Sequence, residues 1–244
     1  MEGSRSRMAL FTYGEAMRNW SWLLISFAAA FSGAGHATPP ARVEIEYELL
    51  RNGSRMAEVV ERLEHGNGAY SLTETWRGKG MYALLGRAKR TSSGELTAEG
   101  PRPHEFVDER SGRDTQRVSF DWKANTITRR YKGATRTEPV PPDTQDRLSF
   151  LFALSFLSQK GVPVTFHVAD GRGMSVHTYT PNGREKVVTP AGEFEALKVL
   201  RRNGSGDMVD IWLAAERGYL PVRIVVLEED GTRYEHVATR ISKP

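Results

Sequence analysis

The segment VPPDTQDRLSFLFALSFL, residues 140–157, decides the fold that we predict for this chain. Eight of the ten residues from Leu148 to Leu157 are apolar, and only Ser149 and Ser155 interrupt them. Apolar residues that surround a helix on all sides indicate a buried helix. A membrane span needs about 20 apolar residues, so this segment is too short to cross a bilayer. The pattern therefore predicts one short buried helix near residues 145–158.

The residues before this helix define its start. Pro141 and Pro142 end the preceding strand, because proline lacks the N–H group that a strand or helix interior uses. Asp143 or Thr144 can cap the helix. Asp143 and Asp146 also invite comparison with a catalytic carboxylate pair. Acidic residues are favoured at helix N-termini for electrostatic reasons, so we interpret both as capping residues.

Most of the chain on either side alternates between apolar and polar residues. In VEIEYELL, residues 43–50, every second residue is apolar up to Leu49 and the residues between are glutamates, which is typical of a half-buried strand. Turn signals separate the segments, among them Asn52-Gly53, Ser92-Ser93-Gly94 and Pro181-Asn182-Gly183. The spacing predicts strands near 43–50, 56–63, 69–76, 81–90, 104–111, 115–121, 126–132, 162–170, 174–180, 184–190, 194–202, 208–214, 220–229 and 232–241.

These two patterns together predict a mostly β fold. A single curved antiparallel sheet, a half-barrel-like meander, surrounds one short helix on its concave face. No linker or shift in composition divides residues 38–244, so we predict a single β-rich domain there.

The composition excludes several classes of function. The chain has 244 residues, of which 39% are hydrophobic and 26% charged, and this suits a globular protein. Its net charge of +4 is spread over many residues with no basic tract, so nucleic acid is not expected as a partner. The chain contains no cysteine, which excludes disulfides, thiolate metal sites and a cysteine nucleophile.

The N-terminus has the three parts of a secretory signal peptide. Arg18 supplies a positive charge, residues 20–31 form an apolar core, and Gly35-His36-Ala37 offers small residues before the cleavage point. We predict a signal peptide over residues 1–37, with Met17 as an alternative start. No cysteine follows it to carry a lipid. The mature protein is therefore expected in the periplasm of a Gram-negative bacterium, without a membrane span.

No motif supports a catalytic, cofactor or metal site. His167 and His177 lie in neighbouring predicted strands, but no HxH or HExxH arrangement accompanies them, so we interpret them as structural residues. Ser149 and Ser155 lie in the helix, and the chain has no GxSxG sequence. We therefore predict a protein that is not an enzyme and that holds no metal or cofactor.

Six stretches make the chain resemble a known family. They are YELLRNG, GPRPHEF, VSFDW, QDRLSFLFAL, FHVADGRG and IWLAAERGYLPVRI, and they occur in this order across residues 43–241. Together they resemble the bacterial domain-of-unknown-function family 3108, a group of secreted envelope proteins. The resemblance implies a periplasmic, mostly β protein and supplies no catalytic residues.

The expected fold suggests a place for a ligand. A curved sheet wrapped on a helix looks like the periplasmic lipoprotein carriers, which hold acyl chains between the sheet and a helical lid. This analogy predicts a non-catalytic protein that binds or carries a hydrophobic or envelope-derived ligand, such as a lipid, between sheet and helix. The candidate cleft residues are Leu148, Leu151, Phe152, Phe156, Trp212 and Tyr219.

Two alternatives remain at this point. One is a structural or interaction protein of the envelope that pairs with a partner through exposed strand edges. The other is an envelope hydrolase. The aromatic residues of the strands and helix fit either a filled core or the lining of a cleft.

Overall fold

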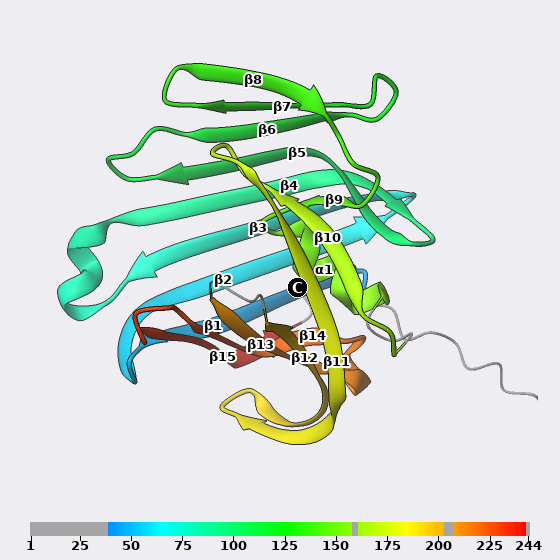
Figure 1. Cartoon of the computed structure of the whole chain (residues 1–244). Coiled ribbons are helices and arrows are strands. Elements are labelled where there is room, and N and C mark those ends of the chain that lie inside the picture. The colour runs from blue at the N-terminus through cyan, green and yellow to red at the C-terminus, as the bar shows by residue number, and fades with distance from the viewer. Residues whose placement is uncertain (1–38, 158–160, 203–206, 243–244) are drawn as a thin grey trace, which may run out of the picture. The chain divides into compact units, whose positions relative to one another are not determined.

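One sheet of 15 strands makes up most of the structure (Figure 1). The structure is a computed structural model, and it describes residues 39–157, 161–202 and 207–242. The strand order is β8-β7-β6-β5-β4-β3-β2-β1-β15-β14-β13-β12-β11-β10-β9. Neighbouring strands are antiparallel except β9 and β10, which are parallel. The predicted curved meander with one short buried helix is confirmed. The predicted signal peptide lies outside the described residues.

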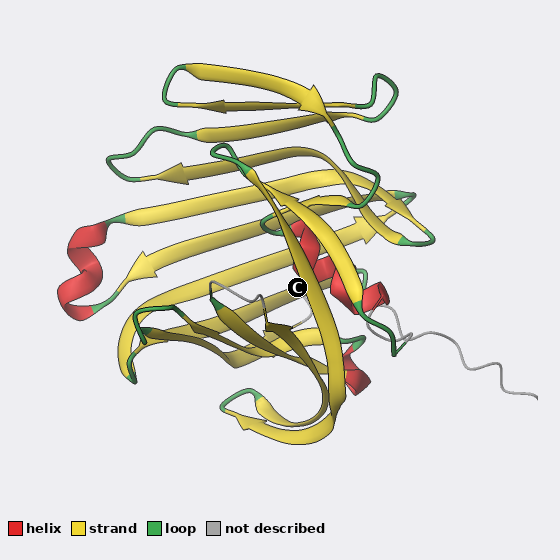
Figure 2. Cartoon of the chain, viewed as in Figure 1, coloured by secondary structure: helices red, strands yellow, loops and turns green. Residues whose placement is uncertain are grey.

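The strands and helices have these bounds. Before the α-helix lie β1 (Arg42–Arg51), β2 (Ser54–Gly66), β3 (Ala69–Gly78), β4 (Arg87–Thr97), β5 (Gly100–Arg110), β6 (Gln116–Asp121), β7 (Thr126–Tyr131), β8 (Ala134–Pro139) and β9 (Thr144–Asp146). After it lie β10 (Val164–Ala169), β11 (Met174–Thr189), β12 (Gly192–Arg202), β13 (Met208–Ala214), β14 (Leu220–Leu227) and β15 (Arg233–Ser242). The helices are α1 (Ser149–Leu157), η1 (Gly80–Leu85) and η3 (Ala215–Arg217) (Figure 2). Within the described ranges no helix is long and apolar enough to cross a bilayer.

Helix α1 packs on the inner face of the sheet, which we define as the face in contact with it. Leu148 and Phe152 join a core cluster with residues of β1 to β7, such as Leu72. Leu151 and Leu154 join a second cluster with residues of β10 to β14. The helix therefore fills the space between two parts of the same curved sheet. This arrangement explains why its apolar residues cover its whole circumference.

The N-terminus of α1 is capped by the buried side chain of Asp146. Its Oδ1 accepts hydrogen bonds from the N–H groups of Leu148 at 2.8 Å and Ser149 at 2.9 Å. In return, the N–H group of Asp146 donates to the Ser149 hydroxyl at 2.9 Å. The Ser92 hydroxyl on β4 donates to Oδ2 at 2.6 Å. Asp146, not Asp143, is thus the capping residue, and it connects the helix to the middle of the sheet.

The structure corrects four details of the predicted strands. Residues 80–85 form η1, so the strand predicted at 81–90 begins only at Arg87. Ser92-Ser93-Gly94 and Pro181-Asn182-Gly183 are not turns but lie within β4 and β11, at irregularities of the strand pairing. Bulges bend a strand, and these bends help the sheet to curve. Strands β8 and β9 were not predicted; β8 is polar and exposed, and β9 has three residues.

Replacing Leu154 by alanine should destabilise the protein strongly. Leu154 is fully buried in the second core cluster, and a buried leucine truncated to alanine typically costs about 2–5 kcal/mol. Leu84→Ala is the matched control, because Leu84 is 95% exposed and exposed substitutions change stability by about 0.5 kcal/mol or less. Urea unfolding followed by circular dichroism measures both. Equal stability of the two variants would show that α1 is not part of the packed core.

Replacing Asp146 by alanine should also lower the free energy of unfolding. The change leaves two backbone N–H groups and the Ser92 hydroxyl without their buried acceptor, and we expect a cost of about 2 kcal/mol or more. Asp143→Ala removes a carboxylate from an exposed position three residues away and should change little. The same urea titration compares them. A larger effect at Asp143 would contradict the assignment of the cap.

Candidate functional site

The predicted cleft residues are divided between the two core clusters. Leu148, Phe152 and the half-buried Phe156 pack with the strands around β3, and the rings of Phe152 and Phe156 meet edge to face at 5.1 Å. Leu151 and Tyr219 belong to the second core cluster. These side chains contact residues of the sheet and are buried except for Phe156.

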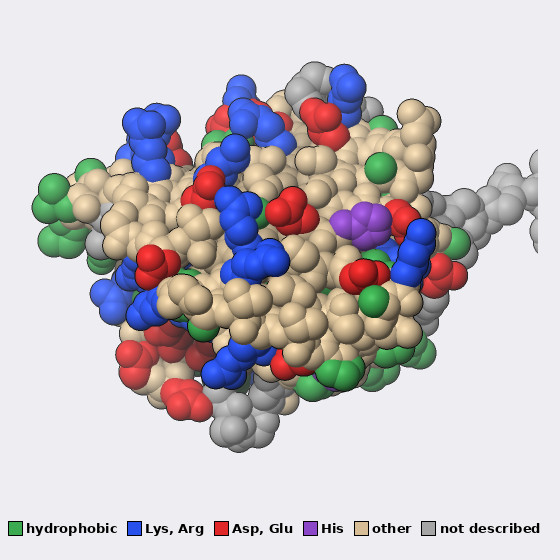
Figure 3. All heavy atoms as spheres, turned by 90° about the horizontal axis from the view of Figure 1, so that it is seen from above, with side chains coloured by type: hydrophobic (Ala, Val, Ile, Leu, Met, Phe, Trp, Pro, Cys, Tyr) green, Lys and Arg blue, Asp and Glu red, His purple; other side chains and the backbone are tan. Residues whose placement is uncertain are grey.

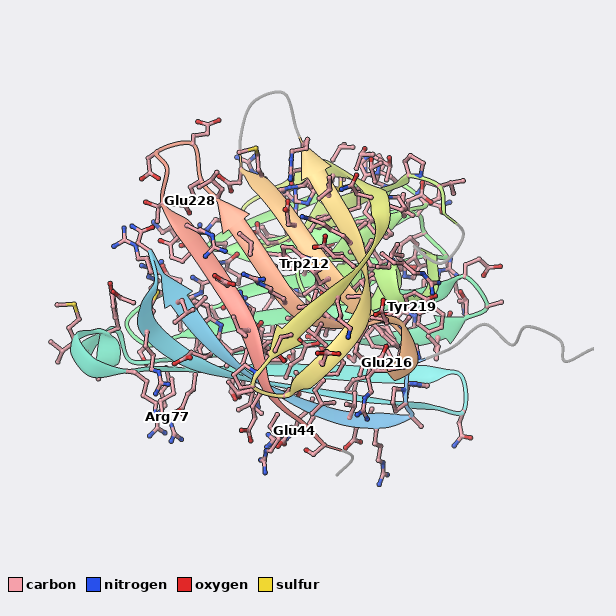
Figure 4. All side chains as sticks on the ribbon, turned by 90° about the horizontal axis from the view of Figure 1, so that it is seen from below. Glu44, Arg77, Trp212, Glu216, Tyr219 and Glu228 are labelled. Carbon is pink, nitrogen blue, oxygen red and sulfur yellow. The ribbon has the colours of Figure 1, made fainter. Side chains whose placement is uncertain are left out.

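Trp212 belongs to the same core cluster as Leu148 and Phe152. Its neighbours along β13, Ile211 and Leu213, belong to the second core cluster. The Trp212 ring also lies between Lys198 and Arg223, whose charged groups are 4.7 Å and 5.1 Å from its centroid. Figure 4 shows Trp212 on the β11–β14 side of the molecule. The structure therefore groups Leu148, Phe152, Phe156 and Trp212 in one cluster, and Leu151 and Tyr219 in the other.

Two surface hollows occur in the described part of the chain away from α1. One, of about 360 Å³, is lined by Lys186, Glu193, Phe194, Glu195, Ala215 and Glu216. The other, of about 870 Å³, is lined by Gly112, Arg113, Asp114, Tyr131, Lys132 and Arg172. Neither is lined by a residue of α1.

The two histidines considered as a metal pair do not converge. Phe166 pairs with His177 and His167 pairs with Val176 in the β10–β11 register, so the two imidazoles point to opposite faces. His177 is hydrogen-bonded to the Ser175 hydroxyl at 2.9 Å. Over residues 39–157, 161–202 and 207–242, no group of three or more histidines and carboxylates could hold a metal ion.

A row of polar side chains crosses the inner face next to α1. The strand register places Glu61 opposite Glu74, Glu74 opposite Arg90, Arg90 opposite Asp108, and Asp108 opposite Gln116. Directly paired residues on neighbouring strands share one face. This face also carries Leu72 and Phe106, which pack in the core with α1. We call Glu61, Glu74, Arg90, Asp108 and Gln116 the inner polar row.

Ion pairs hold the centre of the row in place. The Arg90 guanidinium donates to Glu74 Oε1 at 2.8 Å and to Asp108 Oδ2 at 3.3 Å. Arg110 approaches Asp108 with two of its nitrogens, at 2.7 Å and 3.0 Å. Such bidentate pairs fix geometry as well as charge. Three strands, β3 to β5, thus present a fixed pattern of donors and acceptors to the interior.

Burial and neighbouring charges shift the pKa values of the ionisable side chains in this region. Burial, assisted by the negative charge of Glu74, raises the pKa of Glu61 to about 8. Burial disfavours the ionised form of Asp108, but Arg110 and Arg90 outweigh it and lower the pKa. Burial, together with the charge of Arg90, lowers the pKa of His236 to about 4. At neutral pH, therefore, Glu61 is protonated, Asp108 is ionised and His236 is neutral.

Several buried polar atoms of this region have no hydrogen-bond partner among the residues that the structure describes. They are Nε1 of Trp76, Oε1 of Gln116 and Nδ1 of His236. Gln116 is only 4% exposed. Trp76 shares the face of the row, because it follows Glu74 by two residues on β3, and Arg90 lies 6.0 Å from its ring centroid. Buried polar groups are nearly always satisfied, so these atoms call for water or a bound molecule.

The inner face is less completely covered here than beneath α1. Leu72 and Phe106, in the neighbouring row toward α1, are 1% and 0% exposed. Glu61, Arg90 and Trp76 are only half-buried. Ile224 and Val226 of β14, also on the inner face, are half-buried as well. The inner polar row thus combines half-buried Glu61 and Arg90 with Glu74, Asp108 and Gln116, which are 8%, 2% and 4% exposed.

Sequence reasoning missed these residues because it looked for recognised motifs. The sequence signal for this row is a charged residue at a strand position where the alternation places an apolar one. In YSLTETW, residues 70–76, Glu74 falls on the same side as Tyr70, Leu72 and Trp76. A glutamate in the apolar phase of a strand predicts an inward-facing charge, which is costly unless it is paired or functional.

Comparisons with known proteins match most of the chain. The family model described as "Protein of unknown function (DUF3108)" matches residues 42–237. A putative lipoprotein from Parabacteroides distasonis ATCC 8503 has 9% sequence identity and a TM-score of 0.40, over 85% of this chain and 98% of its own. MucB has 15% identity and a TM-score of 0.28, over 85% of this chain and 55% of its own. The search of curated proteins found no match. At these TM-scores neither likeness extends to function.

Replacing Glu61 by glutamine should change how stability depends on pH. A carboxyl whose pKa is raised on folding stabilises the folded state fully below its ordinary pKa of 4.5, and this contribution is lost as pH rises to about 8. Glutamine mimics the protonated form at every pH. The free energy of unfolding of Glu61→Gln should therefore match that of the wild type near pH 4.5. Near pH 8 it should exceed the wild-type value by more than about 1 kcal/mol.

The measurement is urea unfolding at a series of pH values across this window. Glu64→Gln is the control, because Glu64 lies on the same strand and is exposed. Its stability should follow that of the wild type at every pH. A Glu61→Gln variant that is less stable than the wild type near pH 8 would show that Glu61 is ionised in the folded protein.

Proposed function

The chain belongs to the DUF3108 family of proteins of unknown function, and we propose that it is a non-catalytic binding protein of the cell envelope. In this proposal, it binds an amphipathic ligand on the inner face, with the polar part of the ligand on the inner polar row. The signal-peptide pattern of residues 1–37 supports export to the periplasm. The observation that carries the proposal is the set of buried polar atoms that have no partner among the described residues, beside half-buried side chains of the inner face.

The side chains around the row define the chemical class of the ligand. Protonated Glu61 donates a hydrogen bond, while Gln116 Oε1 accepts one. The Trp76 indole donates as well and offers an apolar ring. This combination suits a molecule with a polar, hydrogen-bonding head and an apolar body, as expected of envelope-derived lipids.

Binding fits these residues better than catalysis does. A protonated carboxyl opposite a carboxylate resembles a general acid and base. Glu74, however, is held by Arg90 at 2.8 Å, and an ion pair stabilises the carboxylate and so weakens it as a base. The function that follows is recognition of the ligand rather than its hydrolysis.

Pairing through a strand edge is the second candidate function, and exposed β8 favours it. Strand β8 ends the sheet and pairs only with β7 among the described strands. Its edge carries Arg136 and Glu138 and ends at Pro139, which are features that oppose pairing with another chain. The other edge strand, β9, is buried and contacts β5 through Gln145, which donates to the carbonyl of Pro101 at 2.9 Å. Ligand binding therefore remains the proposal.

Native mass spectrometry of protein purified from the periplasmic fraction tests the proposal. We expect the wild type to carry an adduct of discrete mass. Trp76→Phe keeps an aromatic ring but removes the unpartnered N–H donor, so the adduct should be reduced about tenfold or more. Trp122→Phe is the matched control, because the Trp122 indole already donates to the carbonyl of Pro103 at 2.7 Å. Its adduct should persist.

Two results would contradict this placement of the ligand. Wild-type protein without any adduct would indicate that the interior holds only water. An adduct that survives Trp76→Phe but disappears in variants of α1, such as Phe156→Ala, would instead place the ligand between helix and sheet.

A further inference from the structure

The loop between β3 and β4 presents apolar side chains to solvent. Its sequence is GKGMYALLG, residues 78–86, and it includes η1. Leu84 is 95% exposed and Met81 is 79% exposed. In a 3-10 helix, residues three positions apart lie on the same side, so these two side chains point together. Figure 1 shows η1 projecting beyond the ends of β3 and β4, and Figure 3 shows hydrophobic side chains gathered at that end.

The loop has a defined structure that fixes this exposure. The N–H group of Lys79 donates to the carbonyl of Met56 at 2.9 Å, and that of Tyr82 donates to the carbonyl of Lys79 at 2.9 Å. A Cβ atom on Gly78 would lie 2.0 Å from the Tyr82 carbonyl oxygen, so only glycine allows the loop to pack this closely. Tyr82 itself is half-buried. The fold thus holds Met81 and Leu84 outward.

Basic side chains outnumber acidic ones at the base of the loop, where Glu58 of β2 lies opposite Arg77. Arg77 and Arg87 lie directly opposite each other in the pairing of β3 and β4, and both are exposed. Neither has an acidic partner within salt-bridge distance in the described part of the chain. Lys79 is paired with Glu58 at 2.8 Å. Figure 4 shows Arg77 pointing away from the sheet near the loop. Like charges directly opposite each other destabilise a sheet, so this pair suggests an external anionic partner.

We propose that the β3–β4 loop docks the protein onto an anionic lipid bilayer. Met81 and Leu84 enter the boundary between headgroups and acyl chains, while Arg77 and Arg87 contact lipid phosphates. An apolar tip with a basic base is the pattern of interfacial anchors. A protein partner fits less well, because a stable protein interface buries about 800 Å² on each side and two side chains supply much less.

Cosedimentation of the purified protein with lipid vesicles tests this docking. We expect binding to phosphatidylcholine vesicles that contain about one third phosphatidylglycerol, and weaker binding to phosphatidylcholine alone. The double variant Met81→Ser/Leu84→Ser should lower the partition coefficient at least tenfold. The double variant Arg77→Gln/Arg87→Gln should remove most of the preference for phosphatidylglycerol and its dependence on salt.

Exposed valines elsewhere provide the matched control. Val176 and Val188 are 55% and 71% exposed on β11, so Val176→Ser/Val188→Ser should bind vesicles as the wild type does. Unchanged melting temperatures confirm that each variant is folded. Absence of wild-type binding, or equal binding by the loop variants, would overturn the proposal. A wild-type dimer in solution that Met81→Ser/Leu84→Ser dissociates would overturn it too, since the loop would then bind a second copy of the chain.

Discussion

The buried carboxylate of Asp146 is the interaction on which the rest of this structure depends. It belongs to β9, it caps α1, and it accepts a hydrogen bond from Ser92 on β4. Since that hydroxyl donates to Asp146, the Tyr70 hydroxyl on β3, 3.0 Å away, donates to Ser92 in turn. A single side chain thus joins one edge of the sheet, the helix and the central strands. Burial raises the pKa of Asp146 to about 6 even though these hydrogen bonds favour the ionised form.

The helix divides the inner face into two regions with different physical properties. Beneath α1 the side chains are fully buried and apolar, and their close packing stabilises a sheet whose edges do not join. Beside α1, directly paired positions on β3, β4 and β5 carry the charged residues Glu74, Arg90 and Asp108. The ion pairs that Arg90 and Arg110 form with Asp108 compensate much of the cost of burying its carboxylate. Trp76, Gln116 and His236 each keep a buried polar atom here that has no partner among the described residues. Our proposal therefore places the ligand in the region beside the helix and not beneath it.

The sequence predicted the class of fold because both deciding signals are local. Period-two alternation marks strands such as β1, and an apolar segment with little polar interruption marks α1. The candidate site was not predictable in the same way. The inner polar row joins residues of β2 to β6, and a one-residue change in the register of any strand would turn its charge to solvent. The bulge at Ser93 and Gly94 also looked like a turn, because the local residues of a bulge and a turn are the same.

The proposed binding site and the proposed docking loop both include residues of β3 and β4. Trp76 lies two residues before Gly78, a distance of about 7 Å along β3, and Gly78 packs against the loop that carries Met81 and Leu84. Arg51 provides a second connection, because hydrogen bonding to Tyr82 of the loop and to Tyr234 of β15 raises the pKa of its guanidinium. Docking through the loop would thus hold this part of the inner face close to the bilayer. An amphipathic ligand could then move between membrane and protein over a short path, with its polar head passing directly from lipid phosphates to the inner polar row.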